Sequence, residues 1–270
     1  SLRRTPSGLN QAVENGELAL HFQPQFHLGT GQLVAVEALL RWNHPELGLL
    51  PPSEFLPAAE QSGLIVPIGQ WVVREACRQV REFPSAAGHP AMRVAINVSG
   101  MQLCQTDFLA QLMRSVDEFG VPPDAIELEI SESMLLRDQG EFVRRMEALR
   151  ERGVRIAIDD FGPGYAALSS LDRLPVNNVK IDPSLVKGLT AGAGGRFLIE
   201  SIVTLASSLN IESTAEGVET LQQLSALQAA GCRRAQGYLF GAPVAGEQFR
   251  AHAAALATEG SLRGLLALPQ

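Results

Sequence analysis

The stretch RIAIDDFGPGYAAL, residues 155–168, joins the end of a buried strand to a charged turn. Ile156 and Ile158 alternate in the manner of a strand that packs into a core. Asp159 and Asp160 follow directly, and a Gly-Pro-Gly turn comes next. Two adjacent carboxylates at the tip of an apolar strand either cap the following helix or hold a positive charge. The rest of the chain decides between these two interpretations.

Short apolar segments alternate with amphipathic segments along most of the chain. Strands are predicted at residues 18–24, 33–40, 93–99, 125–131, 155–160, 177–182, 211–216 and 234–240. Helices are predicted at residues 68–83, 106–120, 141–153, 196–210 and 220–231, where apolar residues recur every three or four positions. The link between the first two strands, residues 27–32, is too short for a crossover helix, so these strands should form an antiparallel hairpin. The pattern predicts an α/β fold, a modified (β/α)8 TIM barrel with an antiparallel first strand.

Composition limits the classes of protein to which the chain can belong. Of its 270 residues 46% are hydrophobic and 19% are charged, which is typical of a folded domain with a sizeable core. The net charge of −7 provides no basic field for a DNA or RNA polymer or an anionic membrane. Its three cysteines lack C-x-x-C spacing, and no apolar run approaches the ~20 residues of a membrane span. We therefore expect a cytoplasmic domain without membrane contact.

Polar residues end seven successive predicted strands. They are Glu37, Asn97, Glu129, Asp159 with Asp160, Lys180, Glu216 and Gln236. One such residue would be an ordinary turn former or helix cap. In a barrel, however, the carboxyl ends of the strands meet at one rim and build the active site. Seven polar ends on that rim indicate a functional site.

The residue types at this rim favour a site for divalent metal ions. Five carboxylates in one small volume would repel one another unless cations compensate them. Carboxylates and the Asn97 carbonyl suit Mg²⁺, Mn²⁺ or Ca²⁺ better than zinc or copper. The pair Asp159 and Asp160 suits a two-metal site, which catalyses in-line attack on phosphate esters. Lys180 could hold the attacking water or neutralise developing charge, and Arg41 is well placed for a phosphate oxygen.

Structural roles compete with these functional ones at several positions. Asp160 alone would be a helix cap, and Asn97 could be a hydrogen-bonded core residue. Lys180 at a barrel strand end could form a Schiff base, as in some aldolases, although neighbouring carboxylates would keep it protonated. Glu127 shares the strand face of Glu129, so it could be either a ligand or half of a structural salt bridge.

Seven short motifs together resemble the EAL domain family. They are EALLRW (37–42), NVS (97–99), ELEISES (127–133), DDFGPGY (159–165), VKID (179–182), AEGVET (215–220) and QGYLF (236–240). The resemblance runs from about residue 18 to residue 243. It implies a phosphodiesterase that hydrolyses the bacterial second messenger cyclic di-GMP to linear pGpG with Mg²⁺ or Mn²⁺. The EAL phosphodiesterase domain would cover residues 16–260, after a linker remnant or N-terminal extension (1–15) and before a C-terminal tail (261–270).

The resemblance also implies roles for individual residues. The first ion would be bound by Glu37, Asn97, Glu129 and Asp159. The second would be bound by Asp159, Asp160 and Glu216, with Glu216 also proposed as a general base in this family. Lys180 would hold the nucleophilic water. Gln23, Arg41 and Gln236 would contact the substrate, Gln236 and Glu219 would support the metal ligands, and Glu132 would anchor the loop after the double aspartate.

One loop departs from the family pattern. Where the family usually has DDFGTGYSSL, this chain has DDFGPGYAAL, with Pro163, Ala166 and Ala167 in place of three hydroxylated residues. Pro163 lacks an N–H and has a fixed φ, so the loop should be stiffer. The alternative function is therefore a silent EAL domain that binds cyclic di-GMP as a receptor. A homodimer and N-terminal sensor or GGDEF domains are the further partners that the resemblance implies.

Overall fold

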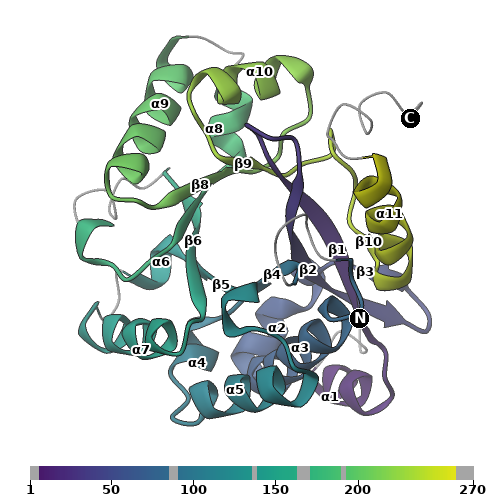
Figure 1. Cartoon of the computed structure of the whole chain (residues 1–270). Coiled ribbons are helices and arrows are strands. Elements are labelled where there is room, and N and C mark those ends of the chain that lie inside the picture. Colours follow the sequence, from purple (N-terminus) through teal and green to yellow (C-terminus); the bar gives the residue numbers. More distant parts are fainter. Residues whose placement is uncertain (1–5, 85–90, 136–138, 163–170, 190–192, 260–270) are drawn as a thin grey trace.

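A closed eight-stranded barrel forms the centre of the computed structural model (Figure 1). The structure describes residues 6–84, 91–135, 139–162, 171–189 and 193–259. The barrel strands are β1 (Leu18–His27), β2 (Leu33–His44), β4 (Arg93–Asn97), β5 (Ile126–Ser131), β6 (Arg155–Phe161), β7 (Asn178–Ile181), β8 (Glu212–Ala215) and β9 (Arg234–Ala235). The predicted α/β barrel is confirmed.

Strand β1 is the antiparallel strand of the barrel. It pairs antiparallel with β2 on one side and with β9 on the other, which closes the cylinder. From β2 through β9 every neighbouring pair is parallel. The hairpin between β1 and β2 is held by hydrogen bonds from His27 N–H to Gln32 O at 2.8 Å and from Gly31 N–H to His27 O at 2.7 Å. The register sets Gln23 opposite Glu37.

Helices surround the barrel (Figure 1). They are α1 (Pro6–Glu14), α2 (Leu56–Ser62), α3 (Ile65–Val80), α4 (Gly100–Leu103), α5 (Phe108–Phe119), α6 (Glu132–Leu135), α7 (Gln139–Glu151), α8 (Pro183–Gly188), α9 (Ala193–Ser208), α10 (Leu221–Ala229) and α11 (Gly246–Glu259). Short 3₁₀ turns lie at Pro52–Glu54, Pro123–Ala125 and Leu171–Arg173. Two short strands, β3 (Gly48–Leu50) and β10 (Val244–Ala245), pair antiparallel with β2 and β1. None of the helices in the described ranges is long and apolar enough to cross a membrane.

Two segments differ from the sequence-based expectation. The strand predicted at residues 234–240 is reduced to the two residues of β9, because the chain turns at Gly237. A Cβ at Gly237 would lie 2.2 Å from the Val218 carbonyl oxygen, so this close approach requires glycine. The segment predicted as a linker or extension contains α1, whose Leu9 and Ala12 are fully buried in the core. The domain boundaries themselves stay a prediction.

The strands alternate between an apolar outer face and a polar inner face. Outward residues such as Val94, Ile96 and Leu128 join one hydrophobic core with the surrounding helices. The inward polar side chains fall into two groups, an upper ring and a lower ring. The upper ring consists of Gln23, Glu37, Asn97, Glu129, Asp159, Lys180, Glu216 and Gln236 at the carboxyl ends of the parallel strands. The lower ring consists of Gln25, Arg93, Glu127, Arg155, Asn178, Glu212, Thr214 and Arg234.

Candidate active site

A β-bulge places both aspartates of the opening motif at the mouth of the barrel. In the pairing of β6 with β7, Ile158 lies opposite Val179 and Phe161 opposite Ile181, so Asp159 and Asp160 share the space of a single partner residue. Asp160 has a φ of 53°, a left-handed conformation that costs a non-glycine residue about 1–2 kcal/mol. The bulge brings carboxylate oxygens of Asp159, Asp160 and Glu216 within 4.8 Å of one another, a group that could hold a metal ion. Such strain at a cluster of carboxylates suggests a functional rather than a capping role for Asp160.

Lys180 lies at the centre of the upper ring, completely buried. Its Nζ is 2.7 Å from Glu129 Oε1 and 2.7 Å from Glu216 Oε1. It also lies 3.2 Å from Asp159 Oδ1 and 3.5 Å from Glu37 Oε2. A single ammonium therefore serves four carboxylates, and Asp160 adds a fifth nearby. When all are ionised the cluster keeps a formal excess of four negative charges.

This imbalance shifts the protonation of the carboxylates. Burial, followed by repulsion from Glu37, raises the pKa of Glu129 well above its ordinary value. Burial also raises the pKa of Glu216, to about 8, with Asp159 adding to the shift and Lys180 opposing it. Burial and Asp159 together raise the pKa of Asp160. Burial alone would lower the pKa of Lys180, but its carboxylate neighbours outweigh burial and hold this pKa well above the ordinary value. Lys180 therefore stays charged, whereas the carboxylates tend to be protonated. The cluster thus favours bound protons or added cations.

Hydrogen bonds fix Glu37 as an ionised group. Its Oε1 accepts a bond of 2.8 Å from Asn97 Nδ2, and its Oε2 accepts one of 2.5 Å from Gln236 Nε2. Burial raises the pKa of Glu37, but Lys180 and these two amides more than offset it, so the pKa is lowered overall. Because the Asn97 amide donates through its nitrogen, its carbonyl oxygen stays available as a ligand. Both oxygens of Glu129 and Oδ1 of Asp159 are buried without a hydrogen bond, although Lys180 lies close to each residue.

The predicted substrate residues lie beside this cluster. Gln236 Nε2 also donates to Gln23 Oε1 at 2.9 Å, and Gln23 Nε2 donates to Gly241 O at 3.0 Å. Both side chains are almost fully buried, and Gln236 contacts Glu37 directly whereas Gln23 contacts Gln236. Arg41 follows Glu37 on the same face of β2 and bonds its own strand at Leu40 O, at 2.8 Å. Burial lowers the Arg41 pKa, while Tyr238 and Glu37 raise it.

The two predicted supporting residues differ in their contacts. Glu132 is buried, and its Oε2 accepts a long hydrogen bond of 3.4 Å from Gly162 N–H, just after the double aspartate. Glu219 is exposed, and its carboxylate makes no hydrogen bond or ion pair with the other described residues. Its supporting role is therefore not reflected in the geometry. Pro163, Ala166 and Ala167 lie outside the described residues.

A cavity of about 440 Å³ adjoins the carboxylates. Glu37, Asn97, Glu129 and Asp159 form its polar wall, and apolar side chains of β2, α2 and α3 form the opposite wall. Its volume and mixed lining fall in the range of about 300–1,000 Å³ that is typical of small-molecule sites. A flat aromatic group could therefore pack on the apolar wall while a phosphate approaches the acidic cluster.

The lower ring settles the role that the sequence left open for Glu127. Its Oε2 accepts a hydrogen bond of 3.2 Å from Arg155, and its Oε1 lies 3.4 Å from Arg234 Nη1. Burial raises the pKa of Glu127, but the nearby arginines more than offset it and lower this pKa to about 2. Glu127 is therefore half of a structural salt bridge. The polar strand ends alone do not reveal this ring, but on the parallel strands its members stand two or four residues before the upper ring, at the spacing expected for one strand face, and on antiparallel β1 Gln25 stands two residues after Gln23.

Comparison with known proteins identifies the family. The family model of the EAL domain matches residues 7–243. The chain belongs to the EAL domain family. It is 40% identical over 246 residues to the bifunctional diguanylate cyclase/cyclic di-GMP phosphodiesterase MucR of Pseudomonas aeruginosa, covering 91% of this chain and 36% of MucR. It is 38% identical over 236 residues to the cyclic di-GMP phosphodiesterase NbdA of the same organism, covering 87% of this chain and 30% of NbdA.

A solved structure supports the same assignment of this EAL domain. The MucR phosphodiesterase in complex with c-di-GMP superposes with a TM-score of 0.83 at 40% identity, covering 90% of this chain and 98% of that chain. This EAL domain spans about a third of the length of the curated relatives it matches. The likeness therefore concerns one domain of those larger proteins.

Proposed function

We propose that this EAL domain is a phosphodiesterase that hydrolyses cyclic di-GMP to linear pGpG with two Mg²⁺ or Mn²⁺ ions. The observation that carries the proposal is the cluster of five carboxylates around buried Lys180 at the carboxyl end of the barrel. An acidic cluster of this kind can hold divalent cations, and such cations compensate the negative charge of a phosphate ester during hydrolysis. MucR and NbdA are named as cyclic di-GMP phosphodiesterases, which supports the choice of substrate.

The side chains of the upper ring fit divalent ions. All of the donors are oxygens, the excess charge is negative, and three buried carboxylate oxygens lack hydrogen bonds. We assign Glu37, Asn97, Glu129 and Asp159 to one ion. We assign Asp159, Asp160 and Glu216 to the other. Bound ions of this kind supply Lewis acidity at phosphate and lower the pKa of water.

The chain's own residues contribute positioning and charge. Gln236 and Asn97 hold Glu37 in one orientation, which keeps it ionised and directed to the centre of the site. Lys180 stays protonated among its carboxylates, so it can donate a hydrogen bond to the attacking water and offset charge at phosphorus. Arg41 is assigned to a phosphate oxygen, and Gln23 and Gln236 are assigned to the substrate side of the mouth. Glu216 is the candidate base, because burial makes its carboxylate a stronger proton acceptor than an exposed one.

Two rival functions receive less support. A Schiff-base mechanism needs a neutral lysine, whereas the carboxylates around Lys180 hold its pKa well above the ordinary value. A silent receptor would be expected to have lost ligands, but this sequence has a carboxylate or an amide at every predicted ligand position. The altered loop that favours the receptor lies outside the described residues.

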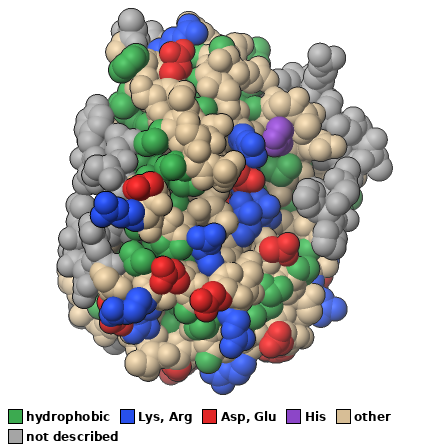
Figure 2. Space-filling view, turned by 60° about the vertical axis from the view of Figure 1, so that its left-hand side comes forward, with side chains coloured by type: hydrophobic (Ala, Val, Ile, Leu, Met, Phe, Trp, Pro, Cys, Tyr) green, Lys and Arg blue, Asp and Glu red, His purple; other side chains and the backbone are tan. Residues whose placement is uncertain are grey.

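The wider assignments rest on the same comparisons. Relatives such as MucR and the oxygen sensor protein DosP of Escherichia coli are about three times as long as the region they share with this chain, so we propose that the natural protein carries sensor or GGDEF domains. We also propose a cytoplasmic location and a homodimer, on the basis of the family resemblance alone. Figure 2 shows acidic and basic side chains interspersed on one face, as expected of a domain that does not bind a nucleic-acid polymer.

Measuring turnover with matched variants tests the proposal. Purified protein is incubated with cyclic di-GMP and either Mg²⁺ or Mn²⁺, with and without a chelator, and the products are separated by chromatography. We expect pGpG only when metal is present, and at least about 100-fold less product from Glu37→Gln, which keeps the shape of the side chain but not its charge. Glu151→Gln, an exposed residue at the end of α7, is the control and should turn over normally. Saturable binding without product with either metal would instead establish the receptor.

A further inference from the structure

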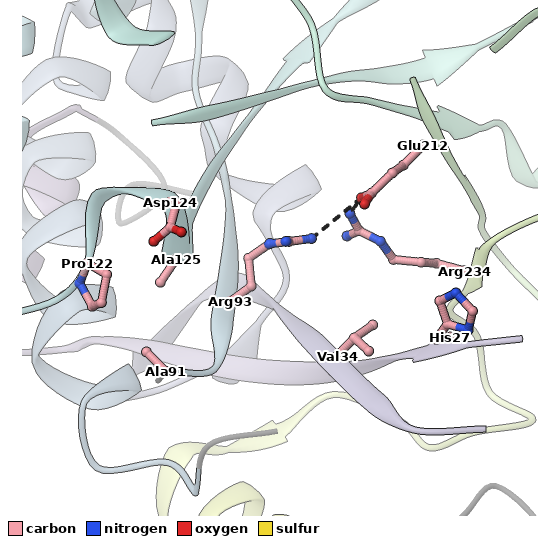
Figure 3. Close-up of a pocket in the computed structure, with 9 residues that line it drawn as sticks. All are labelled: His27, Val34, Ala91, Arg93, Pro122, Asp124, Ala125, Glu212 and Arg234. Atoms are coloured by element: carbon pink, nitrogen blue, oxygen red, sulfur yellow. Dashed lines mark hydrogen bonds and ion pairs between the residues drawn. The ribbon is translucent and has the colours of Figure 1, made fainter. Parts of the chain in front are cut away.

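A second charged cavity lies at the amino-terminal end of the barrel, opposite the candidate active site. This basal cavity has a volume of about 170 Å³, and its polar wall consists of His27, Arg93, Asp124, Glu212 and Arg234 (Figure 3). Arg93, Glu212 and Arg234 are the first residues of β4, β8 and β9, so all three belong to the lower ring. None of these five residues takes part in the upper ring.

The lower ring carries more cationic than anionic side chains. Arg155 Nη2 lies 2.9 Å from Glu212 Oε2, and Arg93 Nη1 lies 3.5 Å from the same oxygen. Arg234 ion-pairs with Glu212 and with Glu127, and Arg155 also bonds to Glu127. Three guanidiniums thus share two carboxylates inside the barrel. Exposed Asp124 at the rim is the only further acid among the described residues that line the cavity.

The Arg93 guanidinium has hydrogen-bonding capacity left over. Arg93 reaches Glu212 only through its long contact of 3.5 Å, and its side chain is 21% exposed. Arg234 is 3% exposed and already engaged, since its Nη2 ion-pairs with Glu212 and its Nη1 donates a long hydrogen bond of 3.4 Å to Glu127 Oε1, so it supplies positive charge at the wall of the cavity. Figure 3 shows the two side chains converging from opposite sides of the cavity. Burial and repulsion from Arg93 and Arg155 lower the pKa of Arg234 to about 10. Glu127 opposes this shift but does not cancel it.

We propose that the basal cavity binds a small oxyanion of the phosphate or sulfate class. Guanidinium groups present planar pairs of N–H donors that match the oxygens of such anions. A bound oxyanion would supply acceptors for the remaining N–H groups of Arg93, whose contact with Glu212 is long, and would balance the third positive charge of the ring. His27 adds a donor, since its Nδ1 accepts the Thr30 N–H at 3.1 Å and the neutral ring then carries its proton on Nε2.

The size of the cavity restricts the ligand. Its volume of about 170 Å³ is below the lower end of the range of about 300–1,000 Å³ for pockets that enclose drug-sized ligands. A cyclic dinucleotide therefore does not fit, and the cavity is not a second substrate site. Glu212 keeps 24% of its side chain exposed, which shows that solvent, and hence a small ion, reaches the wall. The inference does not depend on the proposed phosphodiesterase function.

Calorimetric titration with inorganic phosphate tests this site in the 270-residue chain. Chloride keeps the ionic strength constant, and a chelator removes divalent ions that would bind phosphate at the upper ring. Three variants accompany the unmodified chain. Arg93→Gln removes the excess cation and leaves two guanidiniums opposite two carboxylates, so the ring stays balanced. Asp124→Asn removes the anion at the rim, and Arg41→Gln alters the opposite mouth.

The proposal predicts one saturable phosphate site, whose affinity depends on the charged side chains that line the basal cavity. Binding should be at least about ten-fold weaker in Arg93→Gln, which corresponds to about 1.4 kcal/mol, tighter in Asp124→Asn and unchanged in Arg41→Gln. The proposal is overturned if the unmodified chain shows no saturable binding, or if Arg93→Gln binds phosphate equally well. Loss of binding in Arg41→Gln would also overturn it, by placing the anion at the upper ring. Should Arg93→Gln fail to fold, phosphate binding in Asp124→Asn that is unchanged or weaker would overturn the proposal.

Discussion

In the absence of divalent metal, the free energy of unfolding should fall as pH rises, because the Glu216 carboxyl loses its proton. The pKa of this carboxyl is raised in the folded state from 4.5 to about 8, mainly by burial. The folded state therefore holds a proton that the unfolded chain releases, so the free energy of unfolding decreases from about pH 4.5 to about pH 8. One proton corresponds to about 1.4 kcal/mol per pH unit, which gives a loss of about 2 kcal/mol between pH 6 and pH 8.

Urea denaturation in the presence of a chelator, at pH 6, 7 and 8, measures this slope. The control is Glu216→Gln, which resembles the protonated side chain and should lose the contribution of Glu216 to the slope. The lowered pKa values of His21 and His27 act in the opposite direction below about pH 6.5, but they cancel in the comparison of the two proteins. Adding Mn²⁺ should stabilise the unmodified protein more at pH 8 than at pH 6, because metal binding replaces the proton. A difference in stability between the two proteins that stays constant from pH 6 to pH 8 would refute the reasoning.

Three further predictions concern the rings and the turn after β8. Lys180→Met should lower turnover of cyclic di-GMP at least about 100-fold with metal present, because the buried ammonium is lost, and normal turnover would exclude a catalytic role. Glu127→Gln should lower the free energy of unfolding by about 3–5 kcal/mol in urea titrations, because it leaves the buried guanidiniums with a single carboxylate; a change below 1 kcal/mol would contradict the structural salt bridge. Gly217→Ala should lower the free energy of unfolding by about 1–2 kcal/mol and slow turnover, since Gly217 has a φ of 65° and a Cβ would lie 2.8 Å from Pro183 Cβ. Unchanged turnover would show that the neighbouring Glu216 tolerates this strain.

The sequence predicted the barrel because its signals are local. Alternation of apolar residues marks each strand, and the six residues 27–32 fix the hairpin of β1 with β2. Strand ends on one rim then predict the neighbourhood of Glu37, Glu129, Asp159 and Glu216. These inferences require only periodicity and the geometry common to all parallel barrels.

Other features depend on contacts that have no local signal. The left-handed conformation of Asp160 follows from the bulge between β6 and β7, which only the pairing register reveals. The end of β9 depends on the approach of Gly237 to Val218 in a distant turn. The choice between ligand and salt bridge at Glu127 depended on which arginines of other strands reach it. Long-range packing therefore decided what sequence alone could not.

The most direct test of the central claim is hydrolysis of cyclic di-GMP in ¹⁸O-labelled water with Mn²⁺, followed by mass spectrometry of the product. Activated water that attacks phosphorus must leave one solvent oxygen in the terminal phosphate of pGpG. The account predicts pGpG that carries one ¹⁸O atom, and no product after chelation. Intact cyclic di-GMP, or a linear product without the label, would contradict it.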